Sequence, residues 1–154
     1  MMNNFELKFT ENVSLVTLNN ISANEDSLLK IFKIVSDQDI CIDMISQTAP
    51  LNNAVNLSFT LDDADTAKII AVLYKFKENF ATLTTQILSN NTKILISSEK
   101  MKTQSGIATK VFEILCENKI PVSLITTSET EISLLVTDEH AQMAISVLQK
   151  KLNF

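Results

Sequence analysis

Glycine is nearly absent from this chain, since Gly106 is the single glycine among 154 residues. Phosphate loops, dinucleotide-binding turns and nucleophile elbows each need several glycines, because the backbone there approaches a ligand closely. An ATP-using enzyme is therefore not expected. Ser105 has no visible base beside it, and His140 has no catalytic partner near it and is expected at the surface. The sequence predicts a non-catalytic protein.

Cysteines, basic clusters and long apolar runs are also scarce or missing. Cys41 and Cys116 stand far apart, without a second Cys or a His at metal-ligand spacing. We expect reduced thiols that serve as small apolar side chains, no metal and no cofactor, which fits a cytoplasmic location. The net charge of −5 without a basic face argues against nucleic acid. The N-terminal segment lacks a basic start and a long apolar run, so we expect it not to be a signal peptide, and since no apolar run reaches ~20 residues we expect no membrane contact.

Apolar residues, by contrast, are abundant: they make up 45% of the chain, against 20% charged residues. The apolar content is enough for a packed interior. The low charge favours a protein that buries part of its surface against a partner, and open strands at the edge of a half-covered sheet would invite pairing. We therefore expect a homodimer.

Alternating and β-branched segments predict strands at residues 5–9, 13–18, 40–48, 55–61, 84–88, 92–97, 122–128 and 131–137. Helical spacing predicts helices at residues 27–39, 62–77, 107–119 and 138–151. In the second helix we expect an inward face of Ala67, Ile70, Leu73 and Tyr74.

Polar residues at helix starts have a structural interpretation. Ser22 or Asn24 is expected to cap the first helix. The trio Asp62, Asp63 and Asp65 suggests a metal site, but helix-start chemistry explains it better.

The two halves of the chain repeat as sequence. The segment LLKIFKIVSDQDICIDMIS matches ATKVFEILCENKIPVSLIT, so that Lys30, Phe32, Ile40 and Ile45 fall on Lys110, Phe112, Ile120 and Ile125. IIAVL likewise matches AISVL. A repeat of this size indicates two copies of one unit.

Each unit runs strand, helix, strand, strand, helix and lacks one strand. The missing strands are supplied most economically by residues 84–88 for the first unit and by residues 5–9, crossing over, for the second. We therefore predict an α+β fold of two interlocked ferredoxin-like βαββαβ units in tandem, with antiparallel sheets covered by helices on one face.

Short motifs carry a resemblance to a known family. KMKTQSGIATKVFEILCENKIPVSLITTSETEISLLV resembles the ACT repeat of aspartate kinases, through Met101-Lys102, Gly106, Phe112, Thr126-Thr127-Ser128-Glu129 and Ile132-Ser133. The partner repeat is similar at Ile42-Asp43-Met44-Ile45, Gln47 and Leu57-Ser58-Phe59. The resemblance covers nearly the whole chain.

The resemblance implies a tandem ACT regulatory region of an aspartokinase without the kinase domain. Its first ACT unit would be residues 13–91, and its second would be residues 1–12 plus 92–154. In that family the region binds an amino-acid effector, lysine or threonine, between ACT units and thereby gives feedback control of aspartate-family amino-acid biosynthesis. The family also implies a homodimer whose sheets pair side by side, and a kinase catalytic subunit as a candidate partner.

The resemblance places the ligand site in the second unit. It comprises Met101, Gln104, Ser105, Gly106 and Ile107 at the loop and helix start, Pro121, Val122 and Ser123 on the following strand, Glu129 as a cation partner, and Gln47 from the other repeat. Free amides at the helix start would take the α-carboxylate.

Departures from the family keep several hypotheses open. The first loop, at residues 23–26, has no glycine, and Glu25 and Asp26 would repel a carboxylate. Ser123 lacks the acid of lysine-sensing relatives, and Pro121 has no amide to donate. The chain is thus a sensor acting through a partner enzyme, or a ligand-free ACT-fold interaction protein; an enzyme is the weakest of the three hypotheses. A stand-alone regulator, a separate subunit and a fragment all explain the missing kinase domain, and we expect MMNN to be a natural start.

Overall fold

The computed structural model describes residues 5–152, which form two compact units. The first unit comprises residues 12–89, and the second unit comprises residues 5–11 together with residues 90–152. The start expected at residues 1–4 lies outside the described residues.

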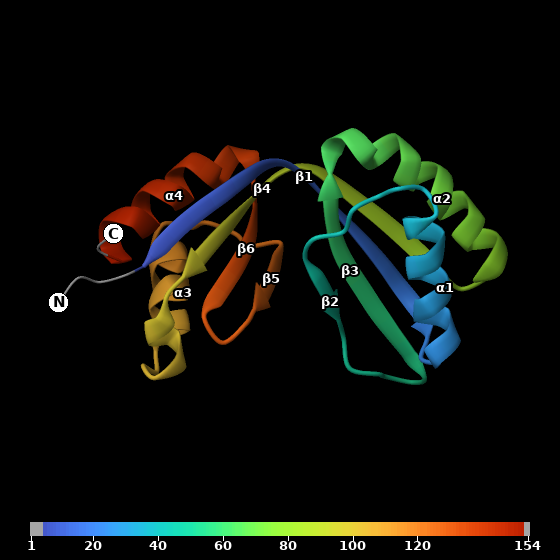
Figure 1. The fold of residues 1–154 in the computed structure, drawn as a ribbon, viewed down its shortest axis with the longest axis horizontal. Coiled ribbons are helices and arrows are strands. Elements are labelled where there is room, and N and C mark those ends of the chain that lie inside the picture. Colours follow the sequence, from blue (N-terminus) through green and yellow to red (C-terminus); the bar gives the residue numbers. More distant parts are fainter. Residues whose placement is uncertain (1–4, 153–154) are drawn as a thin grey trace. The chain divides into compact units, whose positions relative to one another are not determined.

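The first unit is a sheet with two helices (Figure 1). Its elements are part of β1 (Glu6–Ser22), α1 (Glu25–Ser36), β2 (Ile45–Gln47), β3 (Ala54–Asp62), α2 (Thr66–Asn79) and the start of β4 (Thr84–Ser97). The strand order is β2-β3-β1-β4. Both β1 and β2 pair antiparallel with β3.

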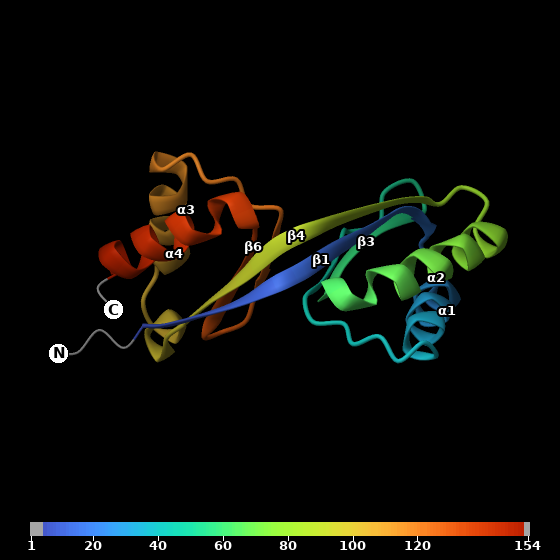
Figure 2. The same cartoon turned by 90° about the horizontal axis from the view of Figure 1, so that it is seen from above.

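The second unit has the same arrangement, except that its last strand comes from the N-terminal end of the chain. Its elements are the end of β4, α3 (Ile107–Glu117), β5 (Leu124–Thr127), β6 (Glu131–Thr137), α4 (Asp138–Leu152) and the start of β1. The order is β1-β4-β6-β5, and both β4 and β5 pair antiparallel with β6. Figure 2 shows β1 running beside β4.

In both units the strand order is that of a ferredoxin-like βαββαβ fold, so the predicted fold class is confirmed. The crossing N-terminal strand is confirmed as well, because Phe5 and Leu7 pack against the core of the second unit.

Two long strands replace four predicted short ones. The predicted strands at residues 5–9 and 13–18 merge into the single strand β1, which begins at Glu6, and those at residues 84–88 and 92–97 merge into β4. Asn12 and Asn90 stand at matching places in these strands, with φ of 59° and 60°. Asparagine tolerates this left-handed backbone better than most residues, so each strand changes direction there without ending.

Alternation along the strands builds each core. In β3 the residues Val55, Leu57, Phe59 and Leu61 are buried against the helices, while Asn56 is exposed. The second core gathers Ile94, Ile96, Val111, Leu134 and Leu148, among others. Period-2 strands and 3.6-period helices therefore meet on one face of each sheet.

Helix caps follow the local sequence. The Asn24 side chain accepts a hydrogen bond from the Ser27 amide at 2.8 Å. The Asp62 carboxylate accepts one from the Ala64 amide at 2.8 Å, at a short 3₁₀ turn before α2. Asn24, and not Ser22, therefore caps α1. Asp62 caps only the 3₁₀ turn, because the N-cap of α2 is Asp65, whose side chain makes no capping hydrogen bond.

The predicted inward face of α2 is wrong for most of its residues. Leu73 is buried, but Ala67 is exposed, Ile70 is 44% exposed and Tyr74 is 69% exposed. The buried stripe is instead Ile69, Val72, Leu73 and Phe76. Apolar residues occupy two stripes of this helix, both at i, i+3, i+4 spacing, so periodicity alone does not choose between them.

Two further expectations need correction. Cys41 and Cys116 are exposed free cysteines and not core side chains. The predicted strand at residues 40–48 is a regular strand only at Ile45–Gln47. Before it, Asp43 and Met44 both bond to the backbone of Thr60, and the Met44 amide donates to the Thr60 hydroxyl at 2.9 Å, so the pairing is irregular there. Within the described residues, no helix has the length and apolar character needed to cross a membrane.

Candidate functional site

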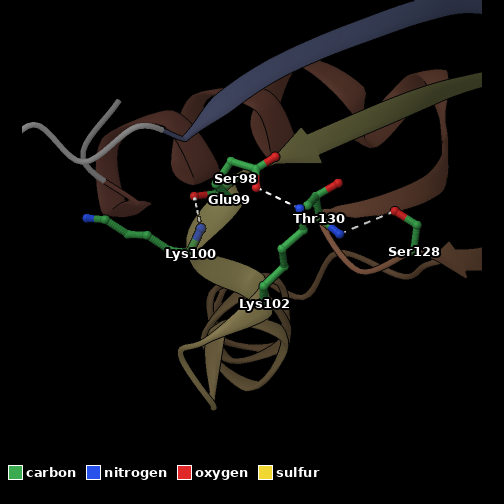
Figure 3. Close-up of polar contacts among 6 residues, drawn as sticks. All are labelled: Ser98, Glu99, Lys100, Lys102, Ser128 and Thr130. Atoms are coloured by element: carbon green, nitrogen blue, oxygen red, sulfur yellow. Dashed lines mark hydrogen bonds and ion pairs between the residues drawn. The ribbon is translucent and has the colours of Figure 1, made fainter.

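The loop between β4 and α3 is fixed at its first residue. Ser98 is buried, and its amide donates to the Thr130 carbonyl at 2.9 Å. Its Oγ accepts from the Lys100 amide at 3.3 Å (Figure 3). These bonds tie the loop to the turn between β5 and β6.

The turn between β5 and β6 closes on itself. The Ser128 amide donates to the Glu131 carbonyl at 2.9 Å, and the Thr130 amide donates to Ser128 Oγ at 3.4 Å (Figure 3). The turn therefore holds Glu129 in place while leaving its side chain exposed.

A 3₁₀ helix, η2 (Glu99–Lys102), carries the loop toward α3. The Gln104 amide donates to the Lys100 carbonyl at 2.8 Å. On its outer side Glu99 and Lys102 form an exposed ion pair at 2.8 Å.

Gly106 is the N-cap of α3 and has φ of +87°. This conformation strains residues that carry a Cβ, which gives the single glycine a physical reason. No side chain caps this helix, and its first turn has no acidic residue. Its leading amides and the positive end of the helix dipole therefore favour an anion.

The loop before α3 and the turn between β5 and β6 line an open hollow of about 320 Å³. It is lined by Met101, Gln104, Ser105, Gly106, Ile107, Ala108, Thr127, Ser128, Glu129 and Ile132. The structure thus brings six of the predicted site residues together around one space. A carboxylate-accepting helix start and a carboxylate side chain share this hollow, an arrangement suited to a zwitterion.

The other predicted site residues lie elsewhere. Pro121, Val122 and Ser123 precede β5 and are not among the residues that line the hollow. The Ser123 amide donates to the Leu135 carbonyl at 2.8 Å, so it serves the sheet. Gln47 is an exposed residue of β2 in the first unit.

Sequence reasoning missed four residues of the hollow: Ala108, Thr127, Ser128 and Ile132. A signal existed, because Thr127, Ser128 and Ile132 belong to the motif that flanks Glu129. The motif gave no indication that the turn folds against the start of α3.

The equivalent helix start in the first unit is capped by a side chain. Asn24 Oδ1 accepts both the amide of Ser27 at 2.8 Å and its hydroxyl at 2.7 Å. Glu25 and Asp26 occupy the first turn of α1. The helix start is thus already capped and already faces negative charge.

The three aspartates before α2 have structural partners. Asp62 caps the 3₁₀ turn, Asp63 accepts from the Ser14 hydroxyl, and Asp65 pairs with Lys68. In the described part of the chain, no group of three or more His, Cys, Asp or Glu residues is arranged to hold a metal ion.

Comparison with known proteins places this arrangement in context. Residues 94–152 match the ACT domain family. An aspartokinase of Bacillus sp. (strain MGA3) is 30% identical over 145 residues, which are 92% of this chain and 34% of that protein. The chain therefore spans about a third of the length of the curated relatives it matches.

Solved structures agree on the fold. The regulatory subunit of aspartate kinase from Thermus thermophilus superposes with a TM-score of 0.85 at 18% identity, over 94% of this chain and 95% of that chain. The aspartate kinase from Synechocystis superposes with a TM-score of 0.89 at 18% identity, over 96% of this chain and 26% of that chain. Residues 94–152 are thus similar to the ACT domain family, and over nearly all of its length the chain is similar in sequence to aspartokinases and in fold to an aspartate kinase regulatory subunit.

Proposed function

We propose that this chain is a non-catalytic regulatory module that binds a free amino acid in the hollow of its second unit. The supporting observation is the shared space between the uncapped start of α3 and the Glu129 carboxylate. The helix start receives the α-carboxylate, and Glu129 receives a cationic group. Met101 and Ile132 offer apolar contact to a side chain.

The effector class is proposed as lysine or threonine, in line with the aspartokinase relatives. Glu129 is the charge that would pair with an ammonium, and Thr127 and Ser128 add hydroxyls beside it. Gln47, Pro121, Val122 and Ser123 stay candidate contacts without support from the hollow itself.

Regulation requires a second state. The bound amino acid shifts an equilibrium between two packings only by its differential affinity for them. This chain matches about a third of the length of its aspartokinase relatives. The part of those relatives that it does not match supports a kinase catalytic subunit as the partner that it controls. We also propose that the chain acts as a homodimer in the cytoplasm, where Cys41 and Cys116 would stay reduced.

A thermal-shift screen of the purified protein against the twenty amino acids at millimolar concentration tests the binding proposal. At ~100 times its dissociation constant, a ligand stabilises the folded state by about 2.7 kcal/mol. A selective, saturable rise in melting temperature with lysine or threonine is expected. A uniform response to all twenty, or none, would contradict the proposal.

The second candidate is a ligand-free ACT-fold interaction protein. It is favoured by the first unit, whose helix start is filled by Asn24. A protein that associates with its partner but shows no amino-acid response would support it. Release of ADP from aspartate plus ATP would show instead that the chain is an enzyme.

A further inference from the structure

The residues of β1 and β4 that pack against the two cores change phase once along each strand. In β1, the odd-numbered Leu7 packs against the second core, whereas the even-numbered Val16 belongs to the first core. In β4, the odd-numbered Ile87 packs against the first core, whereas the even-numbered Ile94 belongs to the second. Because the side chains of a regular strand alternate strictly, a change from odd to even core positions indicates a break in the alternation.

An asparagine with left-handed backbone stands inside each of these intervals. Asn12 in β1 has φ of 59°, and Asn90 in β4 has φ of 60°. The border between the two units falls directly before each of them. A single residue in this conformation bends a strand and shifts its alternation by one position. Both long strands are therefore interrupted at the point where the chain passes from one unit to the other.

A third left-handed asparagine of β1 supplies a comparison, because it lies inside one unit and is anchored. Asn20 has φ of 63°. Its side chain donates to the Thr82 carbonyl at 3.2 Å, and its amide donates to Asn56 Oδ1 at 3.0 Å. Asn12 and Asn90 are exposed, and within residues 5–152 their side chains make no hydrogen bond. The two asparagines at the border thus lack the side-chain anchors that fix Asn20.

Buried hydroxyls fasten the strands to their own units close to these breaks. In the first unit, the hydroxyls of Ser89 and Ser14 share a hydrogen bond at 2.8 Å, and Ser14 also donates to Asp63. In the second unit, Thr92 Oγ1 donates to Asp138 at 2.7 Å. Ser14 and Thr92 are both buried. Bending is thereby confined to the residues between Ser89 and Thr92 in β4 and to those directly before Ser14 in β1.

We propose that Asn12 and Asn90 form a paired hinge at which β1 and β4 bend, so that the two units move as separate rigid bodies. A hinge consists of a few residues that absorb changes in φ and ψ, and left-handed residues are a recurrent feature of switch regions. The hinge is the two-state element that regulation by a bound amino acid requires, and in this role it rests on the proposed function.

Residual dipolar couplings of the backbone amides test the hinge on the wild-type chain without any ligand. Two rigidly joined units share one alignment tensor, whereas units that move independently give tensors of different magnitude. We expect different magnitudes for the amides of residues 14–88 and for those of residues 92–152. A single tensor that fits both sets would overturn the proposal.

Glycine substitutions locate the hinge. Asn12→Gly and Asn90→Gly should each increase the difference between the two tensor magnitudes, because glycine widens the accessible range of φ and ψ. Asn20→Gly is the matched control: it changes the same residue type at nearly the same φ in the same strand, but inside one unit, and should leave the difference unchanged. An equal effect of Asn12→Gly and Asn20→Gly, or no effect of either border substitution, would refute the assignment.

Lysine at millimolar concentration separates the hinge from the binding proposal. If lysine raises the melting temperature and changes the ratio of the two tensor magnitudes, the hinge responds to binding as proposed. If the melting temperature rises and the ratio stays constant, the hinge is not the regulatory element. If no amino acid raises the melting temperature, the binding proposal fails, and the couplings measured without ligand still decide whether the hinge exists.

Discussion

Gly106 concentrates the binding proposal in one residue. As a glycine it gives the start of α3 no side-chain cap, and its φ of +87° is a conformation that residues with a Cβ rarely adopt. No atom lies within 4 Å of the place that a Cβ would take. A Cβ at this position strains the backbone, and a carboxylate also adds negative charge to the hollow. Alanine introduces only the first effect, whereas aspartate introduces both.

Gly106→Asp is predicted to abolish amino-acid binding, because its carboxylate would occupy the start of α3 and repel the α-carboxylate of the ligand. Gly106→Ala is the matched control: it carries the backbone strain of a Cβ at this φ, on the order of 1 kcal/mol, without a side chain that could reach the amides at the start of α3. Titration calorimetry of both variants is the measurement. If the Gly106→Asp variant binds the amino acid as well as the Gly106→Ala variant does, the placement of the ligand carboxylate is wrong.

Glu129 is predicted to be the cation partner. Glu129→Gln keeps the size of the side chain and removes its charge, so affinity should fall on the order of tenfold, as for a charge-assisted hydrogen bond near the surface. Glu131→Gln, an exposed neighbour that does not line this hollow, is the control and should change affinity little. If both substitutions lowered the affinity equally, the effect would come from the overall negative charge near the hollow and not from a direct contact of Glu129 with the ligand.

A hydroxyl on the first strand of each unit bonds to an aspartate at the start of its second helix. Thr92 Oγ1 donates to Asp138 at 2.7 Å, and Ser14 donates to Asp63 in the matching place. Both hydroxyl residues are buried. Thr92→Val, which keeps the shape, should lower the free energy of unfolding by about 1–3 kcal/mol, measured by urea denaturation. Thr92→Ser should cost less, and the reverse order would refute the role of the hydroxyl.

At the scale of elements, β1 is a single strand that contributes residues to both units. Its first residues belong to the second unit and its later residues to the first. Phe5, directly before β1, packs against the second core, whereas Phe9 within β1 is 53% exposed. The N-terminal segment is therefore a structural part of a unit whose other residues begin some eighty positions later.

Phe5→Ala is predicted to destabilise the second unit by about 2 kcal/mol, because a partly buried aromatic side chain is lost. Phe9→Ala should change stability by less than about 0.5 kcal/mol. Hydrogen exchange read on β6 and on β3 would separate the units. Faster exchange confined to β6 in Phe5→Ala is expected, and equal loss in both strands or none would contradict the crossing assignment.

Sequence reasoning succeeded where one signal determined one outcome. The repeat, the alternation of β3 and the glycine at the start of α3 each have a single structural solution. It failed on α2, where two apolar stripes compete, and only packing against β1 and β3 selects Ile69 over Ile70. It also missed Ala108 and Ile132, because a hollow made by a loop and a distant turn has no local pattern.

At the scale of the whole molecule, the two units have kept one fold and differ in chemistry. The first unit has a capped, acidic helix start and an apolar outer face on α2. The second has an open helix start beside Glu129. Amino-acid binding is therefore proposed for the second unit alone.

The stoichiometry of binding tests this division most directly. Titration calorimetry of the wild-type chain with the amino acid that raises its melting temperature should give one ligand per chain, and Gly106→Asp should remove that binding entirely. Two ligands per chain, or one ligand that survives Gly106→Asp and is lost on substitution of Asn24, would contradict the assignment of the site to the second unit.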